Sequence, residues 1–184
     1  LCISIIVLST YTGYKAIDYY SLYFYEILNY SKQDAASVVA NLSYLRPISA
    51  LLAGIIADKV SSKNSALVLF VMLVLSYSFL SVLELDNNFI YFLYSSFIIS
   101  MIAVFSLRGI FYSFLEETKV PAKVSGIAVG IISFIGYMPD IFVGPIFGLI
   151  LDTQSGIRSF QNCFYFLLSF SFLGLLSSVF VKRK

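Results

Sequence analysis

The sequence predicts an all-α membrane protein, a six-transmembrane-helix bundle built from two inverted three-helix units. Three observations predict it: an apolar composition, a series of long apolar runs, and a repeated distribution of charge among those runs. Of the 184 residues, 59% are hydrophobic and only 12% are charged, with a mean hydropathy of +0.90. Soluble domains average roughly a quarter charged residues, and a chain of this size cannot bury so much apolar surface in water. Its natural solvent is therefore lipid.

Six apolar runs are long enough to cross a bilayer, which requires about 20 mostly apolar residues. They are too long and too little alternating for the strands of a membrane barrel, so we expect helices, which satisfy their backbone groups internally. Short polar linkers such as "NYSKQD", "DKVSSKN" and "DTQSGIRSFQN" separate the runs. The expected spans are 1–28, 35–57, 65–84, 89–114, 124–151 and 160–181.

The six runs differ in the charge that they carry, and the difference repeats. The third and sixth hold no charge in their apolar cores, whereas the charged positions of the others are Lys15, Asp18 and Glu26 in the first, Arg46 in the second, Arg108 in the fourth and Asp140 in the fifth. Charges inside a membrane face a bundle interior or a watery cavity. Two charged helices followed by an uncharged one, twice over, predict two three-helix units with the third and sixth helices facing lipid.

A shared spacing also links the two units. Arg46 precedes Asp58 by twelve residues and Asp140 precedes Asp152 by twelve, and both mid-helix charges adjoin a proline, Pro47 and Pro139. Units of three helices enter the membrane from opposite sides, as in transporters built from inverted repeats.

The distribution of lysine and arginine predicts the orientation. One set of loops and ends carries seven of these residues, from Lys59 to Lys184, and the other carries two, Lys32 and Arg158. Because positive loops stay in the cytoplasm, we expect both chain ends there. The chain opens at Leu1 inside an apolar run without an initiator methionine, and we expect it to be a fragment of a longer protein.

Composition also narrows the function. The chain has no histidine, and its two cysteines, Cys2 and Cys163, both lie in apolar runs. No metal cluster, phosphate-binding loop or pair of catalytic carboxylates is visible in the sequence, so we expect neither an enzyme nor a bound cofactor or metal. A net charge of +2 and the absence of basic runs argue against nucleic-acid binding.

The segment "GIIADKVSSKN", residues 54–64, resembles the cytoplasmic loop signature G-x-x-x-D-[RK]-x-G-[RK] of the major facilitator superfamily. Gly54, Asp58 and Lys59 match, but a serine stands where the second glycine is expected. The copy is similar to the degraded one of that family, which joins helices 8 and 9. The resemblance implies that residues 1–184 form the C-terminal half, helices 7 to 12, of a 12-helix transporter whose N-terminal half is missing. The stretch 108–148 also resembles bacterial members that carry polar or anionic solutes.

The resemblance implies a conformational latch at Gly54, Asp58 and Lys59. In the family, the aspartate contacts the positive end of a helix in the opposite half and stabilises the outward-facing state. A carboxylate at the C-terminal end of a helix is disfavoured by the helix dipole, which also suggests an outside partner. We expect Gly54 to allow close approach of another helix. The alternative is a solvated interfacial aspartate beside a lysine that reaches the interface.

The first helix carries a candidate substrate-binding stripe. Lys15 and Asp18, three residues apart, share a face with Tyr11, and the resemblance implies that this helix lines the central cavity. The alternative is an internal ion pair that holds helices together. Arg46 lies in mid-helix, where Pro47 removes a helical hydrogen bond from the carbonyl of Ser43. It is either a substrate ligand or a structural partner of Asp140 or Asp18.

Two further groups of residues have candidate roles in gating and packing. Arg108 is followed by Glu116 and Glu117, and this spacing favours gating salt bridges over substrate contact. The glycine pairs Gly126–Gly130 and Gly144–Gly148 predict close helix packing on the fifth helix, which Gly136, Pro139 and Pro145 make easy to bend.

These observations predict an alternating-access secondary transporter in the bacterial inner membrane. Lys15, Arg46 and Arg108 exceed Asp18 and Asp140 by one positive charge, which predicts a small anionic solute bound by Lys15, Arg46, Tyr11, Asp18 and Asp140. A proton or sodium ion is the expected coupling partner. The alternative is a self-contained six-helix channel or an oligomeric membrane scaffold.

Overall fold

The computed structural model describes residues 1–83, 89–111, 113–117 and 121–181, and every regular element in this part of the chain is helical. Five of the described helical segments are long and apolar enough to cross a membrane: Lys32–Val60, Ser62–Val82, Ile90–Ile110, Lys123–Thr153 and Ile157–Phe180. The protein is a membrane helical bundle, as the composition predicts.

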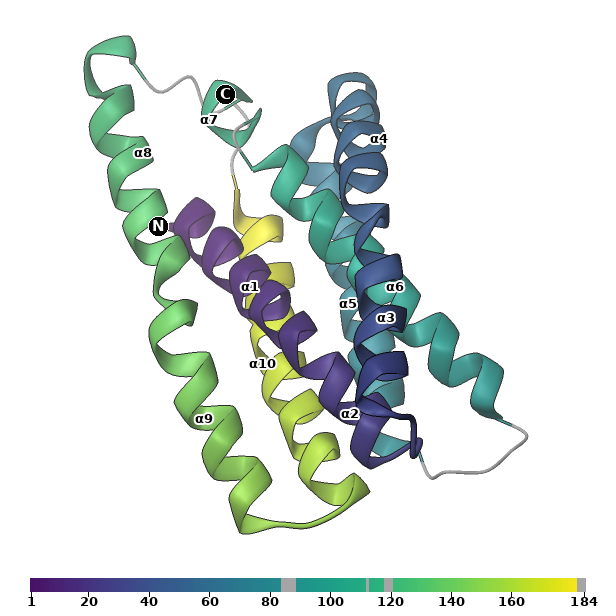
Figure 1. Cartoon of the computed structure of the whole chain (residues 1–184). Coiled ribbons are helices and arrows are strands. Elements are labelled where there is room, and N and C mark those ends of the chain that lie inside the picture. Colours follow the sequence, from purple (N-terminus) through teal and green to yellow (C-terminus); the bar gives the residue numbers. More distant parts are fainter. Residues whose placement is uncertain (84–88, 112, 118–120, 182–184) are drawn as a thin grey trace.

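The first expected span, residues 1–28, is helical but broken. It consists of α1 (Cys2–Ala16), a 3₁₀ turn η1 (Ile17–Tyr19) and α2 (Tyr20–Glu26). It is not among the five candidate spans, because the 3₁₀ turn divides it into two shorter helices. Figure 1 shows it running obliquely through the middle of the molecule, where α1 packs against α6, α8, α9 and α10.

The next elements extend beyond their apolar runs because polar side chains cap them. They are α3 (Lys32–Ser43), α4 (Leu45–Val60) and α5 (Ser62–Val82). The hydroxyl oxygen of Ser31 accepts a hydrogen bond from the backbone N–H of Asp34, and that of Ser61 accepts one from Asn64. Such N-caps satisfy the free N–H groups of a first turn. The expected starts at residues 35 and 65 are therefore three residues late.

The second half contains α6 (Ile90–Ile110), α7 (Ser113–Glu117), α8 (Ala122–Tyr137), α9 (Pro139–Thr153) and α10 (Ile157–Phe180). The expected span 89–114 ends earlier, at Ile110, and the expected span 124–151 is divided at Met138. Pro139 begins α9, a position that tolerates its missing N–H group.

The start of α1, the end of α10 and the α4–α5 connection lie towards one end of the bundle in Figure 1, whereas the α2–α3 and α9–α10 connections lie at the other. The α2–α3 and α4–α5 connections, which follow one another along the chain, thus lie at opposite ends. This arrangement places Lys59 and Lys63 at the same end as the α10 terminus, which is the grouping that the charge count requires.

Hydroxyl groups inside the bundle bond back to their own helices. Thr10 donates to the carbonyl of Ile6 at 2.8 Å, Ser171 to that of Leu167 at 2.9 Å and Ser178 to that of Gly174 at 2.8 Å. Other buried bonds join two elements, such as the one between the hydroxyls of Tyr20 and Ser100 at 2.9 Å. These bonds satisfy polar groups that lipid would leave without a partner.

Close helix contacts occur at other glycines than those expected. A Cβ atom at Gly109 of α6 would lie 2.8 Å from the backbone oxygen of Ala50 in α4, and Gly174 of α10 lies equally tightly against the ring of Phe70 in α5. Nothing in the described chain lies within 4 Å of such an atom at Gly54, Gly126, Gly130 or Gly148. Within the described residues, no helix packs closely against these four glycines, so their expected role in close helix contacts stays a prediction.

Candidate functional site

Three breaks in the helices position the charged residues of the bundle. The α1–α2 rod is interrupted at η1, the α3–α4 segment at Tyr44, and the α8–α9 segment at Met138. Lys15 precedes the first break and Asp18 lies within it, Arg46 follows the second break and Asp140 follows the third. The proline next to each of the last two charges explains why the helix is interrupted there, since its ring removes a backbone hydrogen bond.

Lys15 lies between two carboxylates. Its Nζ atom is 3.1 Å from Oδ1 of Asp140 in α9 and 3.6 Å from Oδ2 of Asp18 in η1. All three side chains are partly exposed, at 34% for Lys15, 45% for Asp140 and 66% for Asp18. The ion pair expected between Lys15 and Asp18 is present, and a second pair ties α1 to α9. The expected pairing of Arg46 with Asp140 or Asp18 is not found among the described residues; Lys15 pairs with both carboxylates instead.

The two arginines contact tyrosines of α1 instead. Nη1 of Arg46 donates a hydrogen bond to the hydroxyl of Tyr14 at 3.3 Å, and Nη2 of Arg108 donates one to the hydroxyl of Tyr11 at 3.3 Å. Cζ of Arg108 lies 3.8 Å from the ring centroid of Tyr14 and 4.7 Å from that of Tyr11. Cζ of Arg46 lies 5.5 Å from the Tyr14 centroid. In the described part of the chain neither guanidinium forms an ion pair.

The expected gate is only partly described. Arg108 lies in the last turn of α6, but its contacts are with α1. The backbone of Glu116 lies in α7, whereas its side chain is outside the described residues. The neighbouring Glu117 carboxylate accepts a hydrogen bond from the backbone N–H of Ser62 at the start of α5.

A small hollow opens beside Arg46. Its volume is about 80 Å³, and it is lined by Tyr14, Ile17, Asp18, Ser43, Arg46 and Phe105. Its lining residues come from three regions that are far apart in the sequence: the α1–η1 junction, the two sides of the α3–α4 break, and α6. Tyr14, Ser43 and Phe105 did not emerge from the sequence, although Tyr14 lies three residues after Tyr11 and directly before Lys15.

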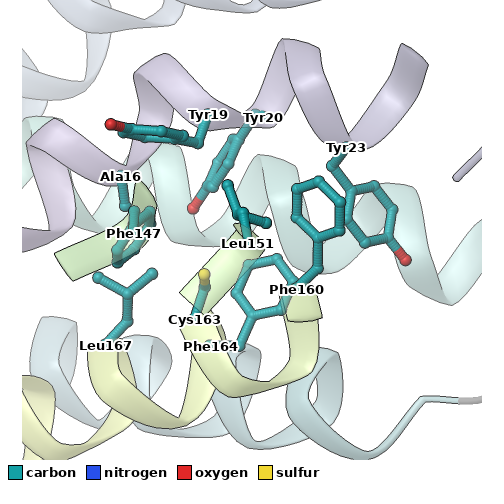
Figure 2. A pocket seen from close by; sticks show the side chains of 10 residues that line it. All are labelled: Ala16, Tyr19, Tyr20, Tyr23, Phe147, Leu151, Phe160, Cys163, Phe164 and Leu167. Carbon is teal, nitrogen blue, oxygen red and sulfur yellow. The ribbon is translucent and has the colours of Figure 1, made fainter. Parts of the chain in front are cut away.

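An aromatic pocket lies further along the bundle, and it is packing rather than a solute site. Figure 2 shows Tyr19, Tyr20 and Tyr23 of the first rod facing Phe160, Cys163, Phe164 and Leu167 of α10, with Phe147 and Leu151 of α9 beside them. The space left between these side chains is about 10 Å³, which is at most the room that one water molecule needs.

The expected latch residues lie at the end of the bundle that the loop charges predict to be cytoplasmic. Asp58 and Lys59 are exposed at the end of α4, and they line a hollow of about 240 Å³ together with Ser113 and Glu117. Beside them, Nζ of Lys63 donates to the carbonyls of Val179 and Val181 at 2.8 Å each, which holds the start of α5 against the end of α10. Asp58 has no ion-pair partner in the described chain.

Comparison with known proteins agrees with a membrane location. The chain is 33% identical over 81 residues to the inner membrane protein YihN of Escherichia coli (strain K12), a match that covers 44% of this chain and 19% of that protein. It is 26% identical over 164 residues to the inner membrane protein YqcE of the same strain, covering 86% of this chain and 38% of that protein. No family model matches the chain, and no solved structure does. The chain thus spans less than half the length of these curated relatives. With its five apolar helical segments and its likeness to two inner membrane proteins, it is a multi-pass inner membrane protein.

Proposed function

We propose that the chain is the C-terminal six-helix half of a major facilitator superfamily transporter, which carries a small anionic solute across the bacterial inner membrane by alternating access. The observation that carries this proposal is the meeting of broken helices at one place: the breaks of α1–α2, α3–α4 and α8–α9 bring Lys15, Asp18, Arg46 and Asp140 into one region. Transporter binding sites are typically formed by discontinuous helices at the contact of two repeats.

The packing of the two three-helix units supports an inverted repeat. The first unit runs from α1 to α5 and the second from α6 to α10. The first rod, α1–α2, packs through α1 against α8, α9 and α10, whereas α6 packs against α4 and α5, and α5 packs against α10. Each unit therefore presents its first helix to the second and third helices of the other, as a two-fold axis in the membrane plane requires.

Uncovered apolar faces support a missing second half. The large side chains of α4 and of α8–α9 are exposed on faces that no described helix contacts, among them Ile48, Leu51, Ile55, Ile131, Phe134 and Ile141. Both segments flank α1 in Figure 1. A preceding six-helix half, within the greater length that the relatives have, would cover these faces, close the other wall of the cavity and contact Gly54 and Asp58.

Electrostatics supports an anionic solute. Lys15 already has two carboxylate partners, so Arg46 is the better anion ligand of the two cations that the sequence indicates. A charge without a partner in the membrane is costly, about 2.5–3.5 kcal/mol on insertion scales. A bound anion or a water-filled cavity offsets this cost.

Counterflow tests the proposal directly. The full-length protein is reconstituted into vesicles loaded with an unlabelled anion, phosphate or succinate, and the entry of the same labelled anion is followed. A carrier that alternates between two states accumulates label transiently, because unlabelled solute leaving the vesicle returns the binding site to the outside. Simple equilibration without accumulation would identify a channel, and absence of flux for every anion in the panel would favour the scaffold.

The latch has its own test in the same assay. Asp58→Asn should slow counterflow by about tenfold while solute affinity stays within about twofold, because the substitution removes a contact that stabilises one conformational state and none that touches the solute. Asp152→Asn, at the corresponding helix end of the second unit, is the matched control and should transport normally. A tenfold loss of affinity in Asp58→Asn with unchanged flux at saturation would reject the latch.

A further inference from the structure

Two guanidinium groups from different helices share one tyrosine. Arg46 of α4 approaches the ring of Tyr14 with its Cζ at 5.5 Å from the centroid, and Arg108 of α6 does so at 3.8 Å. Their hydrogen bonds go to different hydroxyls, that of Tyr14 for Arg46 and that of Tyr11 for Arg108. The two cations therefore lie within the reach of one small solute, at the inner surface formed by α1, α4 and α6.

Arg108 has unused donor capacity. Its Nη1 atom is buried and has no hydrogen-bond partner in the described structure, and no described carboxylate lies within ion-pair distance. Contact with two tyrosine rings stabilises the cation, but it leaves the Nη1 donor of the guanidinium unsatisfied. A buried donor without a partner is costly, and an incoming acceptor would remove that cost.

The chemistry of the pair selects an oxyanion. Guanidinium groups present a planar fork of N–H donors that matches carboxylate and phosphate oxygens. The adjoining hollow, which Arg46 lines, has a volume of about 80 Å³, whereas one water molecule needs about 10–15 Å³ of such space. The hollow can therefore admit a carboxylate or phosphate group. Asp18 lines the same hollow, so a hydroxyl or ammonium group next to the anion finds an acceptor there.

We propose that Arg108 is a solute-binding residue rather than a gating residue, and that Arg46 and Arg108 together bind the phosphate or carboxylate group of a solute that also carries a hydrogen-bond donor. This inference rests on the proposed transport function, and it reassigns Arg108 from the gating role that its neighbour Glu116 suggests in the sequence. Tyr14 lies against both guanidinium groups.

Binding measurements on the purified full-length protein test this proposal. The probes are inorganic phosphate, acetate and glycerol 3-phosphate, titrated while the thermal unfolding midpoint and the heat of binding are recorded. We expect the wild-type protein to bind glycerol 3-phosphate more tightly than phosphate, because only the former carries alcohol hydroxyls that can reach Asp18 while its phosphate group stays on the arginines. Arg108→Gln and Arg46→Gln should each raise the Kd by about tenfold or more, since each removes charge-assisted hydrogen bonds.

Two further variants separate binding from gating and from folding. Arg108→Lys keeps the charge but loses the fork, so it should fold and still bind about three- to tenfold more weakly. Glu116→Gln should leave every Kd within about twofold. Wild-type affinity in Arg108→Lys or Arg108→Gln would overturn the proposal, and so would a loss of thermal stability in Arg108→Gln without a change in Kd.

The outcomes also distinguish this inference from the transport proposal. If Arg46→Gln loses phosphate binding while Arg108→Gln and Glu116→Gln both bind normally and slow counterflow, Arg108 is a gate and only the present inference fails. If the wild-type protein binds none of the three probes, the oxyanion assignment fails. Binding that depends on both arginines without any counterflow would uphold the site and reject the transporter.

Discussion

Lys15 contacts carboxylates from two different elements, and this contact decides which cations remain available to a solute. The sequence presents Lys15, Arg46 and Arg108 as three similar intramembrane cations. In the structure, Lys15 is bound by Asp18 and Asp140, whereas the two arginines contact only tyrosines among the described residues. Lys15, Asp18 and Asp140 together carry a net negative charge, and the neighbouring Arg46 and Arg108 carry a net positive one. The one excess positive charge counted in the sequence is thus the sum of two regions of opposite sign.

The two partners of Lys15 predict unequal effects of substitution. Asp140→Asn leaves the neutral pair of Lys15 with Asp18, whereas Lys15→Gln leaves two carboxylates without a cation. We expect Lys15→Gln to lower the free energy of unfolding by about 2–3 kcal/mol more than Asp140→Asn, given the cost of an unpaired charge in the membrane. Thermal unfolding of the purified full-length protein in detergent measures this difference.

The double variant serves as the control for charge balance. Lys15→Gln combined with Asp140→Asn should recover part of the lost stability, because it removes one of the two unpaired carboxylates. Additive losses in the double variant, or equal losses in the two single ones, would show that the ion pairs do not determine stability here.

At the level of elements, the contact between α4 and α6 holds Arg46 and Arg108 in position. Gly109 lets the two helices approach until a Cβ atom would lie 2.8 Å from the backbone of Ala50. The hydroxyl of Ser106 donates to the carbonyl of Ser49 at 3.3 Å in the same contact. Gly109 is adjacent to Arg108, so the distance between the helices also determines where the second guanidinium lies.

A pair of glycine substitutions tests this contact. Gly109→Ala should lower the free energy of unfolding by about 1–3 kcal/mol, the usual cost of overpacking, because the obstructing atoms belong to backbone and cannot rotate away. Gly54→Ala, where nothing in the described chain lies within 4 Å, should leave the fold of this half within about 0.5 kcal/mol. Limited proteolysis and thermal unfolding of both variants measure the difference. Equal stability of the two variants would mean that α4 and α6 do not pack as described.

At the level of the whole molecule, the start of α1, the end of α10, the α4–α5 connection and α7 lie towards one end of the bundle. The loop charges predict that this end is cytoplasmic. The hydrogen bonds of Lys63 to the carbonyls of Val179 and Val181 use one of these positive charges to bind the end of α10. A lysine that satisfies free carbonyls at a helix C-terminus also interacts favourably with the helix dipole.

Thiol labelling in intact cells tests the orientation. In a background with Cys2 and Cys163 replaced by serine, a cysteine at Ser155 should react with an impermeant reagent added outside, and one at Asn64 should react only after the cells are opened. Both positions are exposed in connections or helix ends. Asn87, in the α5–α6 connection, lies outside the described residues, so Ser155 is the better probe of that end. The reverse labelling pattern would overturn the assignment of both chain ends to the cytoplasm.

The sequence by itself determined that the protein is a membrane helical bundle, where its helical segments approximately lie, and which charged residues lie within those segments. These features can be read from the order of residues alone. The length of an apolar run determines whether it can span a membrane, and a charged residue within such a run is costly whatever its neighbours in space. It also placed the prolines beside Arg46 and Asp140, where the helices do break. Its errors at helix ends arose because serine caps add turns that apolar length does not register.

The tertiary structure decided which charges meet. Whether Lys15 or Arg46 pairs with Asp140 depends on how α1, α4 and α9 are rotated and separated. Both residues are more than ninety positions from Asp140 in the sequence, and the sequence alone does not show which of them lies close to it in space. The same holds for Gly109, whose close contact depends on a neighbour in α4, and for Tyr14, which is one tyrosine among 14 until two guanidinium groups lie against its ring. Local pattern specifies what each helix can do, but the packing of helices specifies which of those groups are satisfied and which are left for a solute.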